Sequence, residues 1–375
     1  MTISTHSIDL TRNLLAFNTM NPPGQEQECA RYLGSLLESV DFDVRCYEFS
    51  PQRTTIIARL KGTSNRVPLC FTGHIDTVPL GTTTWNYDPF SGEISGDKVY
   101  GRGSTDMKSG VAAMMAAAIQ MARFRTLKTG LMLILTAGEE TCCQGAYHLA
   151  SLDNALGEAG AIAVGEPTAN YPWIGHKGAV RFEIRTKGIT AHASMPEQGV
   201  NAINKAARAV LKLQEFDFQI NPHPILGKPT LNVGTIAGGI NINSVPDHCT
   251  IEVDIRTIPG QNHEEIQQQL QTFLGSDVEI NLLNKAQSIA TSEKNEWIQS
   301  VFQIVEPYLK AKPIAKGATF FTDASVLTPA FGNPPTIILG PGEPEMAHKT
   351  DEFCHLSKIE ESVEIYTKIA EAWCR

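Results

Sequence analysis

The chain has 375 residues, of which 42% are hydrophobic and 19% charged, a composition that is ordinary for a globular protein. Its net charge of −9 argues against a nucleic-acid or anionic-membrane partner, because either would be met by clustered lysine and arginine. The length exceeds that at which one hydrophobic core stops growing, so two domains, or one domain interrupted by another, are expected.

Neither a secretion signal nor a membrane span is predicted. Residues 1–17 lack a basic head and carry Asp9 and Arg12 within the apolar pattern, which is not typical of a signal peptide. The longest apolar run, Val111 to Ile119, is half of the roughly 18 residues that a membrane helix requires, and it predicts a buried helix. The eight cysteines are scattered without a CxxC pair, which favours reduced thiols in a cytoplasmic protein over a zinc knuckle or a disulfide framework.

The first part of the chain alternates between helical and extended patterns. Helical spacing runs to Phe17, breaks at residues 21–24, and resumes from about Gln25 to Val40. Apolar runs typical of strands then follow, with helical stretches between several of them. These runs are TTIIARL (Thr54 to Leu60), VPLCFTG (Val67 to Gly73), LMLILTA (Leu131 to Ala137), AIAVG (Ala161 to Gly165) and PTIILG (Pro335 to Gly340). The alternation predicts an α/β fold, with a central sheet flanked by helices.

The middle of the chain has a different pattern. From Ala179 it predicts a strand, a helix, two strands and a helix, with polar alternation along the strands. This order indicates a small α+β domain inserted into the sheet, because PTIILG resembles the earlier strands but follows the insert. We therefore expect a catalytic domain of residues 1–178 and 286–375, interrupted by a smaller domain of residues 179–285.

Polar residues of the types that bind metals follow the ends of these apolar runs. In open α/β sheets, ligands gather beyond the carboxyl ends of the strands, so residues far apart in sequence can converge there. Two histidines and several carboxylates in that position predict a metal site. The residues are His74 and Asp76 after VPLCFTG, Asp106 after KVYGRGST, Glu139 and Glu140 after LMLILTAG, Glu166 after AIAVG, and His348 after PTIILGPGEPEMA.

Each of these residues also has an ordinary structural alternative. His74 could be a core histidine, and Asp106 could cap the alanine-rich helix that follows it. Glu166 could be a turn residue before a proline, and His348 could be a surface histidine in a loop. Asp76 lies two residues after His74, on the same face of an extended segment, so it could accept the second imidazole N–H and fix the tautomer of the ligand.

The GRGSTD turn, which ends at Asp106, raises the alternative of a dinucleotide-binding loop. Its sixth position holds an acid in place of glycine or alanine, and an acid there would repel a pyrophosphate. The patterns GxxxxGK[ST] and GxSxG are absent, which argues against kinase and serine-hydrolase functions.

Five motifs in order resemble the acetylornithine deacetylase and succinyl-diaminopimelate desuccinylase family of dizinc deacylases and peptidases. They are GHIDTVP (Gly73 to Pro79), YGRGSTDMKSG (Tyr100 to Gly110), TAGEET (Thr136 to Thr141), VGEPT (Val164 to Thr168) and AHKTDE (Ala347 to Glu352). The resemblance implies a zinc-peptidase-like catalytic domain interrupted by a smaller dimerisation domain, and hence a homodimer. It also implies two divalent metal ions, with zinc as the expected metal and cobalt or manganese as alternatives.

The resemblance assigns a role to each residue of the predicted site. His74 and Glu166 would bind one metal, Glu140 and His348 the other, and Asp106 would bridge both, while Asp76 would orient His74 and Glu139 would be the general base. This division fits the chemistry, because two metals can share a water, lower its pKa and polarise an amide carbonyl. A base must still move the water's proton to the leaving amine. Cys142 and Cys143, which follow the two acids, are expected to be bystanders in the next helix.

The inserted domain carries three further candidates. TAHASMPEQGVNAI (Thr190 to Ile203) resembles a segment from which family members send a histidine into the neighbouring subunit's active site, so His192 would stabilise the oxyanion; a surface histidine is the alternative. NINSVPD and DIRTIPG place Asn243 and Arg256 where the family contacts the substrate carboxylate. A structural salt bridge is the alternative for Arg256.

The predicted substrate is a small N-acyl amino acid, hydrolysed at its amide bond. In the family that the chain resembles, deacylases tend to carry Glu at the position of Glu166, whereas branches that act on peptides with a free N-terminus often carry Asp. HKG, TLNVGTIAGG and DIRTIPG look closer to acetylornithine deacetylase than to the desuccinylase. FFTDASVL (Phe320 to Leu327), however, departs from that pattern. Acetylornithine is therefore the leading substrate, with N-succinyl-diaminopimelate or a dipeptide as alternatives. A binding homologue that has lost catalysis is disfavoured, because every predicted ligand and Glu139 are present.

Overall fold

The computed structural model describes residues 6–124 and 127–375, so residues 1–5, on which the signal-peptide prediction partly rested, lie outside it. The chain divides into two compact units, each of which is described by itself. The first comprises Met1–Gly175, Ala290–Gly317 and Thr322–Arg375, and the second comprises His176–Ile289 and Ala318–Phe321.

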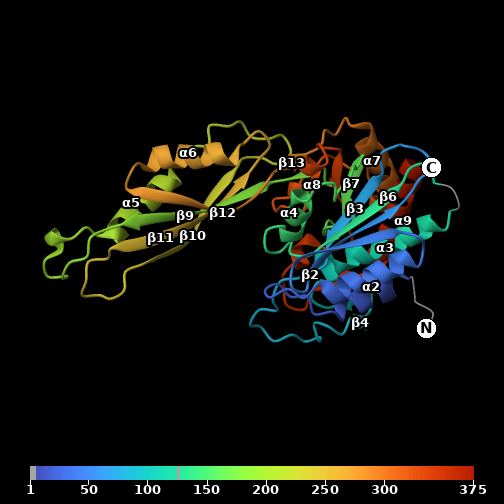
Figure 1. Ribbon diagram of the computed structural model, residues 1–375, viewed down its shortest axis with the longest axis horizontal. Coiled ribbons are helices and arrows are strands. Elements are labelled where there is room, and N and C mark those ends of the chain that lie inside the picture. The colour runs from blue at the N-terminus through green and yellow to red at the C-terminus, as the bar shows by residue number, and fades with distance from the viewer. Residues whose placement is uncertain (1–5, 125–126) are drawn as a thin grey trace. The chain divides into compact units, whose positions relative to one another are not determined.

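A six-stranded sheet forms the centre of the first unit, in the order β1-β2-β6-β3-β7-β14 (Figure 1). The neighbours β6, β3, β7 and β14 run parallel, whereas β1 and β2 are antiparallel additions at one edge. The strands are β1 (Asp43–Ser50), β2 (Arg53–Leu60), β3 (Leu69–His74), β6 (Leu131–Thr136), β7 (Ala161–Val164) and β14 (Thr336–Ile338). All five predicted strands belong to this sheet, and β14 pairs with β7 although the inserted segment separates them in sequence. The sequence missed β1, because this edge strand is largely exposed and has no apolar run.

Helices cover both faces of this sheet. Every residue of β3 and β6 is buried, which requires a covering layer on each side. The predicted alanine-rich helix is α3, which is almost wholly buried and packs against α1, α9 and β3. The helices of this unit are α1 (Ser7–Leu15), α2 (Gln27–Glu38), α3 (Ser109–Ala122), α4 (Gln144–Ser151), α7 (Glu296–Leu309), α8 (Ala324–Ala330) and α9 (Leu356–Cys374).

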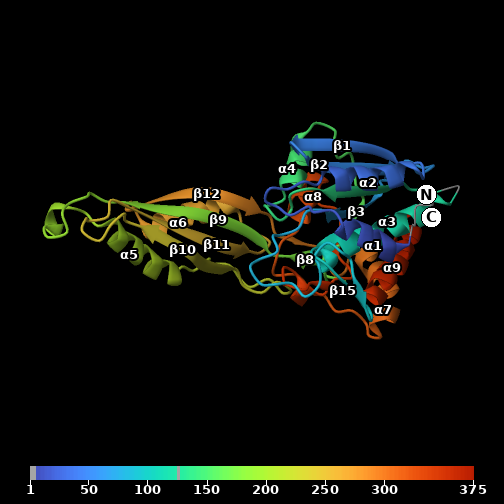
Figure 2. The same cartoon turned by 90° about the horizontal axis from the view of Figure 1, so that it is seen from below.

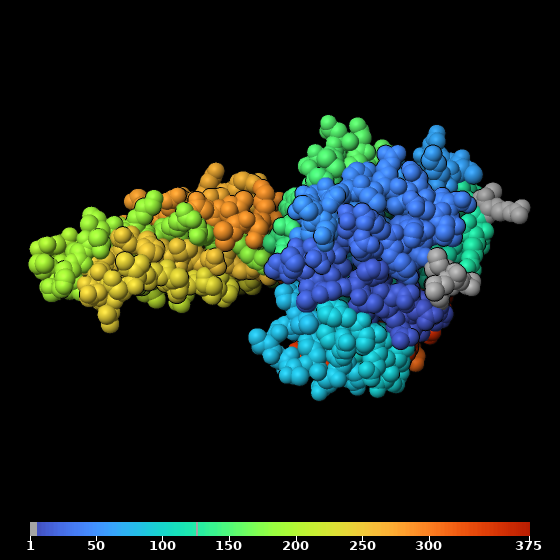
Figure 3. Space-filling view, turned by 60° about the horizontal axis from the view of Figure 1, so that its bottom comes forward, coloured from blue at the N-terminus to red at the C-terminus, as the bar shows by residue number. Residues whose placement is uncertain are grey.

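A smaller sheet joins two segments that are distant in sequence. The strands β4 (Ile94–Ser95), β5 (Lys98–Tyr100) and β15 (Phe353–His355) pair in the order β15-β5-β4. The chain before β4, light blue in Figure 3, lies at the surface of the first unit, where Tyr87 stacks on Tyr100 with 3.8 Å between ring centroids. Asp106 follows β5 and His348 precedes β15, so this pairing brings two predicted ligand segments together.

The second unit is a four-stranded antiparallel sheet in the order β10-β11-β9-β12, with two helices (Figure 2). Alternate strand residues pack with the helices in one core, as the polar alternation predicted. The elements are β9 (Gly178–Lys187), α5 (Ala202–Gln214), β10 (Thr230–Gly238), β11 (His248–Thr257), α6 (His263–Leu274) and β12 (Val278–Ala286). A further short pair, β8 (Gly175–His176) and β13 (Ile289–Ala290), lies where the chain passes from one unit to the other. The sequence missed β12, because a register shift between Leu282 and Asn284 interrupts its two-residue period.

Among the residues described, none of the helices combines the length and the apolar character that crossing a bilayer requires.

Candidate metal centre

The carboxyl ends of the parallel strands deliver the predicted ligands to one edge of the sheet. His74 is the last residue of β3 and lies opposite Thr136, the last residue of β6. Glu139 and Glu140 follow β6, and Glu166 lies two residues after β7. Because these strands are parallel neighbours, their ends coincide, and the side chains converge as predicted.

Asp106 lies between the two predicted histidines. Its Oδ1 atom is 3.1 Å from Nε2 of His74, and its Oδ2 atom is 3.4 Å from Nε2 of His348. The other two acids flank this arrangement: Glu166 Oε1 is 3.8 Å from Nε2 of His74, and Glu140 Oε1 is 3.1 Å from Nε2 of His348. The structure therefore brings all five predicted ligands together, with one carboxylate oxygen of Asp106 facing each histidine.

The helix-cap alternative for Asp106 is wrong. Helix α3 begins at Ser109, its N-cap residue is Lys108, and Asp106 lies in the preceding turn, Ser104–Lys108. Gly110 in the first turn of α3 passes close to the end of β7, where a Cβ atom would lie 2.1 Å from the carbonyl oxygen of Gly165. This close approach requires glycine, and it places the Asp106 turn beside the segment that carries Glu166.

Asp76 contacts more than the imidazole it was predicted to orient. The nearest atom to Nδ1 of His74 is the backbone oxygen of Asp76, at 3.0 Å, while the carboxylate Oδ1 is 3.5 Å away. The carboxylate accepts the backbone N–H groups of Glu139 and Glu140, at 3.1 and 3.2 Å, and the side-chain amide of Asn21 at 2.9 Å. Asp76 therefore links the end of β3 to both acids that follow β6.

Glu352 is a buried acid that the sequence analysis did not single out. It ends the AHKTDE motif, where only the histidine was taken as a candidate. Its carboxylate pairs with the guanidinium of Arg102 at 2.6 Å and accepts the backbone N–H of Asp106 at 3.0 Å. Two more N–H groups of the same turn, those of Gly103 and Thr105, also donate to it. The signal available in the sequence was that Glu352 is an acid in the same motif as the predicted ligand His348.

The electrostatics of the cluster indicate a deficit of positive charge. Burial, together with the charges of neighbouring acids, raises the pKa of Glu139 and of Glu166 well above the usual range. Hydrogen bonds that His348 donates to Asp106 and Glu140 raise its pKa to about 10. Burial opposes a charge on His74, but the charge of Glu166 and the bond to Asp106 outweigh it and raise its pKa.

A divalent cation fits this donor set. Imidazole nitrogens and carboxylate oxygens are the ligands that zinc accepts in proteins. Ligand atoms of His74, Asp106 and Glu140 all lie within 4.8 Å of one another. A cation would supply positive charge to these buried carboxylates.

Two further residues near Glu139 were missed or misjudged. Asp323, just before α8, is buried and accepts the hydroxyl of Thr136. Burial raises the pKa of Asp323 to about 6. The prediction that Cys143 lies in the next helix is wrong, because α4 begins at Gln144. The sulfur of Cys143 lies 3.9 Å from Oε1 of Glu139.

The three candidates of the insert belong to the second unit. His192 is exposed, and its segment pairs with that of Asn243, whose carbonyl accepts the N–H of Ala193 at 3.0 Å. Arg256 forms the salt bridge considered as an alternative, with Nε donating to Asp254 at 2.7 Å, and its guanidinium lies 5.9 Å from the ring centroid of Phe321. Their roles toward a substrate stay predictions.

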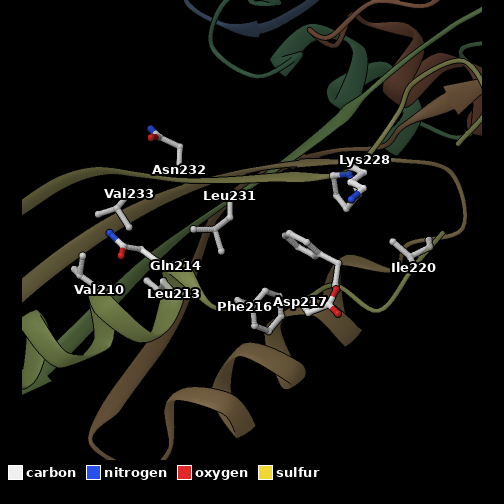
Figure 4. Close-up of a pocket in the computed structure, with 12 residues that line it drawn as sticks. Val210, Leu213, Gln214, Phe216, Asp217, Ile220, Lys228, Leu231, Asn232 and Val233 are labelled. Atoms are coloured by element: carbon white, nitrogen blue, oxygen red, sulfur yellow. The ribbon is translucent and has the colours of Figure 1, made fainter. Parts of the chain in front are cut away.

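A hollow of about 570 Å³ in the second unit holds none of these candidates. It lies between α5, the segment that follows it and β10, where apolar side chains such as Leu213, Phe216 and Leu231 share the lining with Asp217 and Lys228 (Figure 4).

Two solved structures that share this fold are named as peptidases. A metallo-carboxypeptidase of the M20 family from Sulfolobus solfataricus superposes with a TM-score of 0.83 at 16% identity, over 97% of this chain and 98% of that one. The aminopeptidase PepT of Bacillus cereus superposes with a TM-score of 0.76 at 21% identity, over 98% of both chains. At these identities the likeness shows the fold alone.

Residues 70–372 match the model of Peptidase family M20/M25/M40. The chain belongs to this family. An acetylornithine deacetylase of Aliivibrio salmonicida is 30% identical to this M20 chain, over 91% of it and 90% of the relative. A probable succinyl-diaminopimelate desuccinylase of Staphylococcus epidermidis is 28% identical, over 98% and 97%. The family resemblance and the predicted fold class are thus confirmed, and the M20 chain is a metal-dependent hydrolase of amide bonds.

Proposed function

We propose that this M20 chain hydrolyses the amide bond of an N-acyl amino acid, releasing a carboxylate and a free amino acid, with acetylornithine as the leading substrate. The observation that carries the proposal is the position of Asp106, whose two carboxylate oxygens each face a different histidine. The names of the relatives, a deacetylase and a probable desuccinylase, support a deacylase over other amide hydrolases.

The proposal includes two divalent cations, for which zinc is the expected metal and cobalt or manganese are alternatives. His74 and Glu166 would hold one ion, Glu140 and His348 the other, and Asp106 would contact both. The distances support this division. One oxygen of Asp106 and Glu166 lie close to His74, whereas the other oxygen of Asp106 and Glu140 lie close to His348. The YXEP protein of Bacillus subtilis, described as a dinuclear metal-binding M20 peptidase, shares the fold with a TM-score of 0.74 at 17% identity. When bound, such ions lower the pKa of a water and polarise the substrate carbonyl.

Glu139 is assigned as the general base. Among the described residues, it takes part in none of the ion pairs with the histidines, whereas the neighbouring Glu140 does. Its carboxyl group is buried, with 7% of the residue exposed, and burial raises its pKa, which makes the carboxylate a stronger base. Glu139 would take the proton of the attacking water and pass it to the leaving nitrogen, because an amide nitrogen leaves poorly unless protonated.

Residues of the second unit are assigned to the substrate. Arg256 and Asn243 would bind its carboxylate, and His192 would donate a hydrogen bond to the developing oxyanion. The pairing of the segments that carry His192 and Asn243 supports a joint role for these two. The guanidinium of Arg256 is 29% exposed, so it retains access to a ligand beside its bond to Asp254.

A homodimer formed through the second unit is also part of the proposal. Strand β10 is an edge strand, which offers unpaired backbone groups. Apolar side chains are exposed beside it: Leu211 on α5 is 62% exposed and Ile236 on β10 is 52% exposed. We also propose a cytoplasmic location, which the buried thiols of Cys29, Cys70 and Cys354 support, because thiols persist in a reducing compartment.

A panel of N-acetyl, N-succinyl and N-formyl amino acids and of dipeptides tests the substrate class, with free amine as the readout and with and without a chelator. We expect N-acetylornithine to be cleaved with the highest kcat/KM and the chelator to abolish turnover. Preference for the N-succinyl substrate or for dipeptides would replace the deacetylase assignment by a desuccinylase or a dipeptidase. Activity that survives complete removal of metal would overturn the proposal itself.

Two variants separate the roles of the adjacent acids. Glu139→Gln should retain the metal content of the wild type and lose turnover, whereas Glu140→Gln should first lose affinity for the metal. Turnover close to that of the wild type in Glu139→Gln would remove Glu139 as the base.

A further inference from the structure

Two cysteines lie directly before α4, in an unusual backbone conformation. Cys142 and Cys143 both have positive φ angles, of 71° and 57°. The left-handed backbone is unfavourable for a residue with a Cβ atom, so this segment is held by its surroundings. Its conformation directs Cys143 inward: the side chain is fully buried, and its sulfur lies 3.9 Å from Oε1 of Glu139.

A second acid, Asp323, lies close to the thiol of Cys143 and acts on its pKa as Glu139 does. Burial and the charges of these two acids raise the pKa of Cys143 well above its usual range, so the group stays a thiol. A thiol carries one proton, and it therefore donates to only one of the two carboxyl groups at a time.

Asp323 is anchored on its other side. The residue is 2% exposed, and its Oδ2 atom accepts the hydroxyl of Thr136, at the end of β6. Its Oδ1 atom is buried and has no hydrogen-bond partner among the described residues. A buried acid with an unpartnered oxygen is costly to keep for stability alone. Thr136, Asp323 and Cys143 thus form a continuous connection from the end of β6 to the carboxyl group of Glu139.

We propose that Cys143 and Asp323 are positioning residues that hold the carboxyl group of Glu139 in place for its work as a base. This inference rests on the proposed role of Glu139. The physical reason is the neighbourhood of Glu139: it is adjacent to the ligand Glu140, and a carboxylate free to rotate could itself bind a metal. The contact with the thiol of Cys143 restricts that rotation. The carboxyl group of Glu139 therefore faces the attacking water, and Glu140 binds the metal.

The test compares kcat, KM and metal content in Cys143→Ala, Cys143→Ser and Asp323→Asn. Partners that orient groups of a metal site change activity by about 10- to 100-fold. We expect Cys143→Ala and Asp323→Asn to lower kcat within that range, with KM and metal content close to the wild type. Cys143→Ser should recover most of the turnover, because a hydroxyl donates as the thiol does. Cys142→Ala is the matched control, since it changes a neighbouring cysteine with the same backbone conformation, and it should keep the activity of the wild type.

The outcomes separate this inference from the proposed function. If Cys143→Ala and Asp323→Asn keep the wild-type kcat while Glu139→Gln is inactive, the inference is wrong and the base assignment stands. The same conclusion follows if kcat falls only in proportion to lost metal or lost folded protein, or if serine fails to restore what alanine removes. If Glu139→Gln keeps the kcat of the wild type, Glu139 is not the base, and the proposed function is wrong before this inference is tested. Asp323→Asn preserves the shape of the side chain. If Cys143→Ala does not fold, the kcat of Asp323→Asn tests the inference instead.

Discussion

The carboxylate of Glu352 accepts the backbone N–H of Asp106 at 3.0 Å, although 246 residues separate the two in sequence. Glu352 follows His348 by four residues, so this bond ties the segment of one histidine to the acid that lies between both. The position of Asp106 therefore depends on a residue that would not itself touch a metal.

Replacing Glu352 by glutamine should damage both stability and the metal centre. The variant leaves the buried guanidinium of Arg102, which is 1% exposed, without its charged partner. Removing one member of a buried ion pair costs about 3 to 5 kcal/mol in the free energy of unfolding. We also expect zinc affinity to fall by about 10- to 100-fold, as for other residues that orient ligands. Urea unfolding and chelator competition measure the two effects.

The matched control for Glu352→Gln is Asp97→Asn. Asp97 also accepts a backbone N–H, that of Ser357 at 3.0 Å, but at the surface. Its replacement should cost less than about 1 kcal/mol, because surface interactions of this kind contribute little. If the two changes lowered the free energy of unfolding equally, burial of the hydrogen bonds of Glu352 would add nothing to stability.

Asp76→Asn should weaken metal binding while leaving the fold intact. The N–H groups of Glu139 and Glu140 donate to different oxygens of Asp76, and in asparagine one of these oxygens is replaced by an NH2 group that cannot accept. The acids after β6 would lose their fixed position, and zinc affinity should fall by about 10- to 100-fold. Isothermal titration with zinc measures the change. Asp351→Asn, which removes a carboxylate that accepts the N–H of Asn86 at the surface, should bind zinc as the wild type does.

The second unit should lose stability as the pH falls from about 6.5 to about 4. His263 is 2% exposed, and burial lowers its pKa from 6.5 to about 4. Between these values the unfolded chain binds a proton that the folded chain refuses, so stability is complete above pH 6.5 and is lost on acidification. The shift corresponds to at most about 3 kcal/mol in the free energy of unfolding. Urea unfolding across this range should show a smaller pH dependence for His263→Gln, and an unchanged dependence would contradict this source.

The proposed dimer predicts an asymmetry between the two edges of the second unit's sheet. Leu211→Glu, beside β10, places a charge in the expected interface and should shift the protein toward monomers in light scattering at micromolar concentration. Leu283→Glu on β12, the opposite edge strand, introduces the same charge at a residue that is 47% exposed and should leave the dimer intact. A wild-type monomer under these conditions, or a dimer that survives the change at Leu211, would refute this interface.

Three of the predicted ligands, His74, Glu140 and Glu166, could be found from a local signal. Each lies at or within a few residues of the end of an apolar run, and strand ends in a parallel sheet coincide. Glu352, Asp323 and Cys143 were not predictable in this way, since each acts through contacts that the fold creates. The bond of Asp323 to Thr136 spans 187 residues, and the contact of Cys143 with Glu139 depends on a left-handed turn where a helix was expected. The strands β1 and β12 were not predicted for a related reason. The exposure of β1 and the register shift in β12 remove the alternation of apolar and polar residues that marks a strand.

The pairing of β14 with β7 also fixes the order in which the protein can be completed during synthesis. The chain emerges from the ribosome from its amino end, so the whole inserted segment is made before β14 and before His348. The second unit has its own core and can fold at that stage, as domains do during translation. The sheet of the first unit cannot close before β14 has been made, and the predicted ligand His348 follows ten residues after the end of that strand.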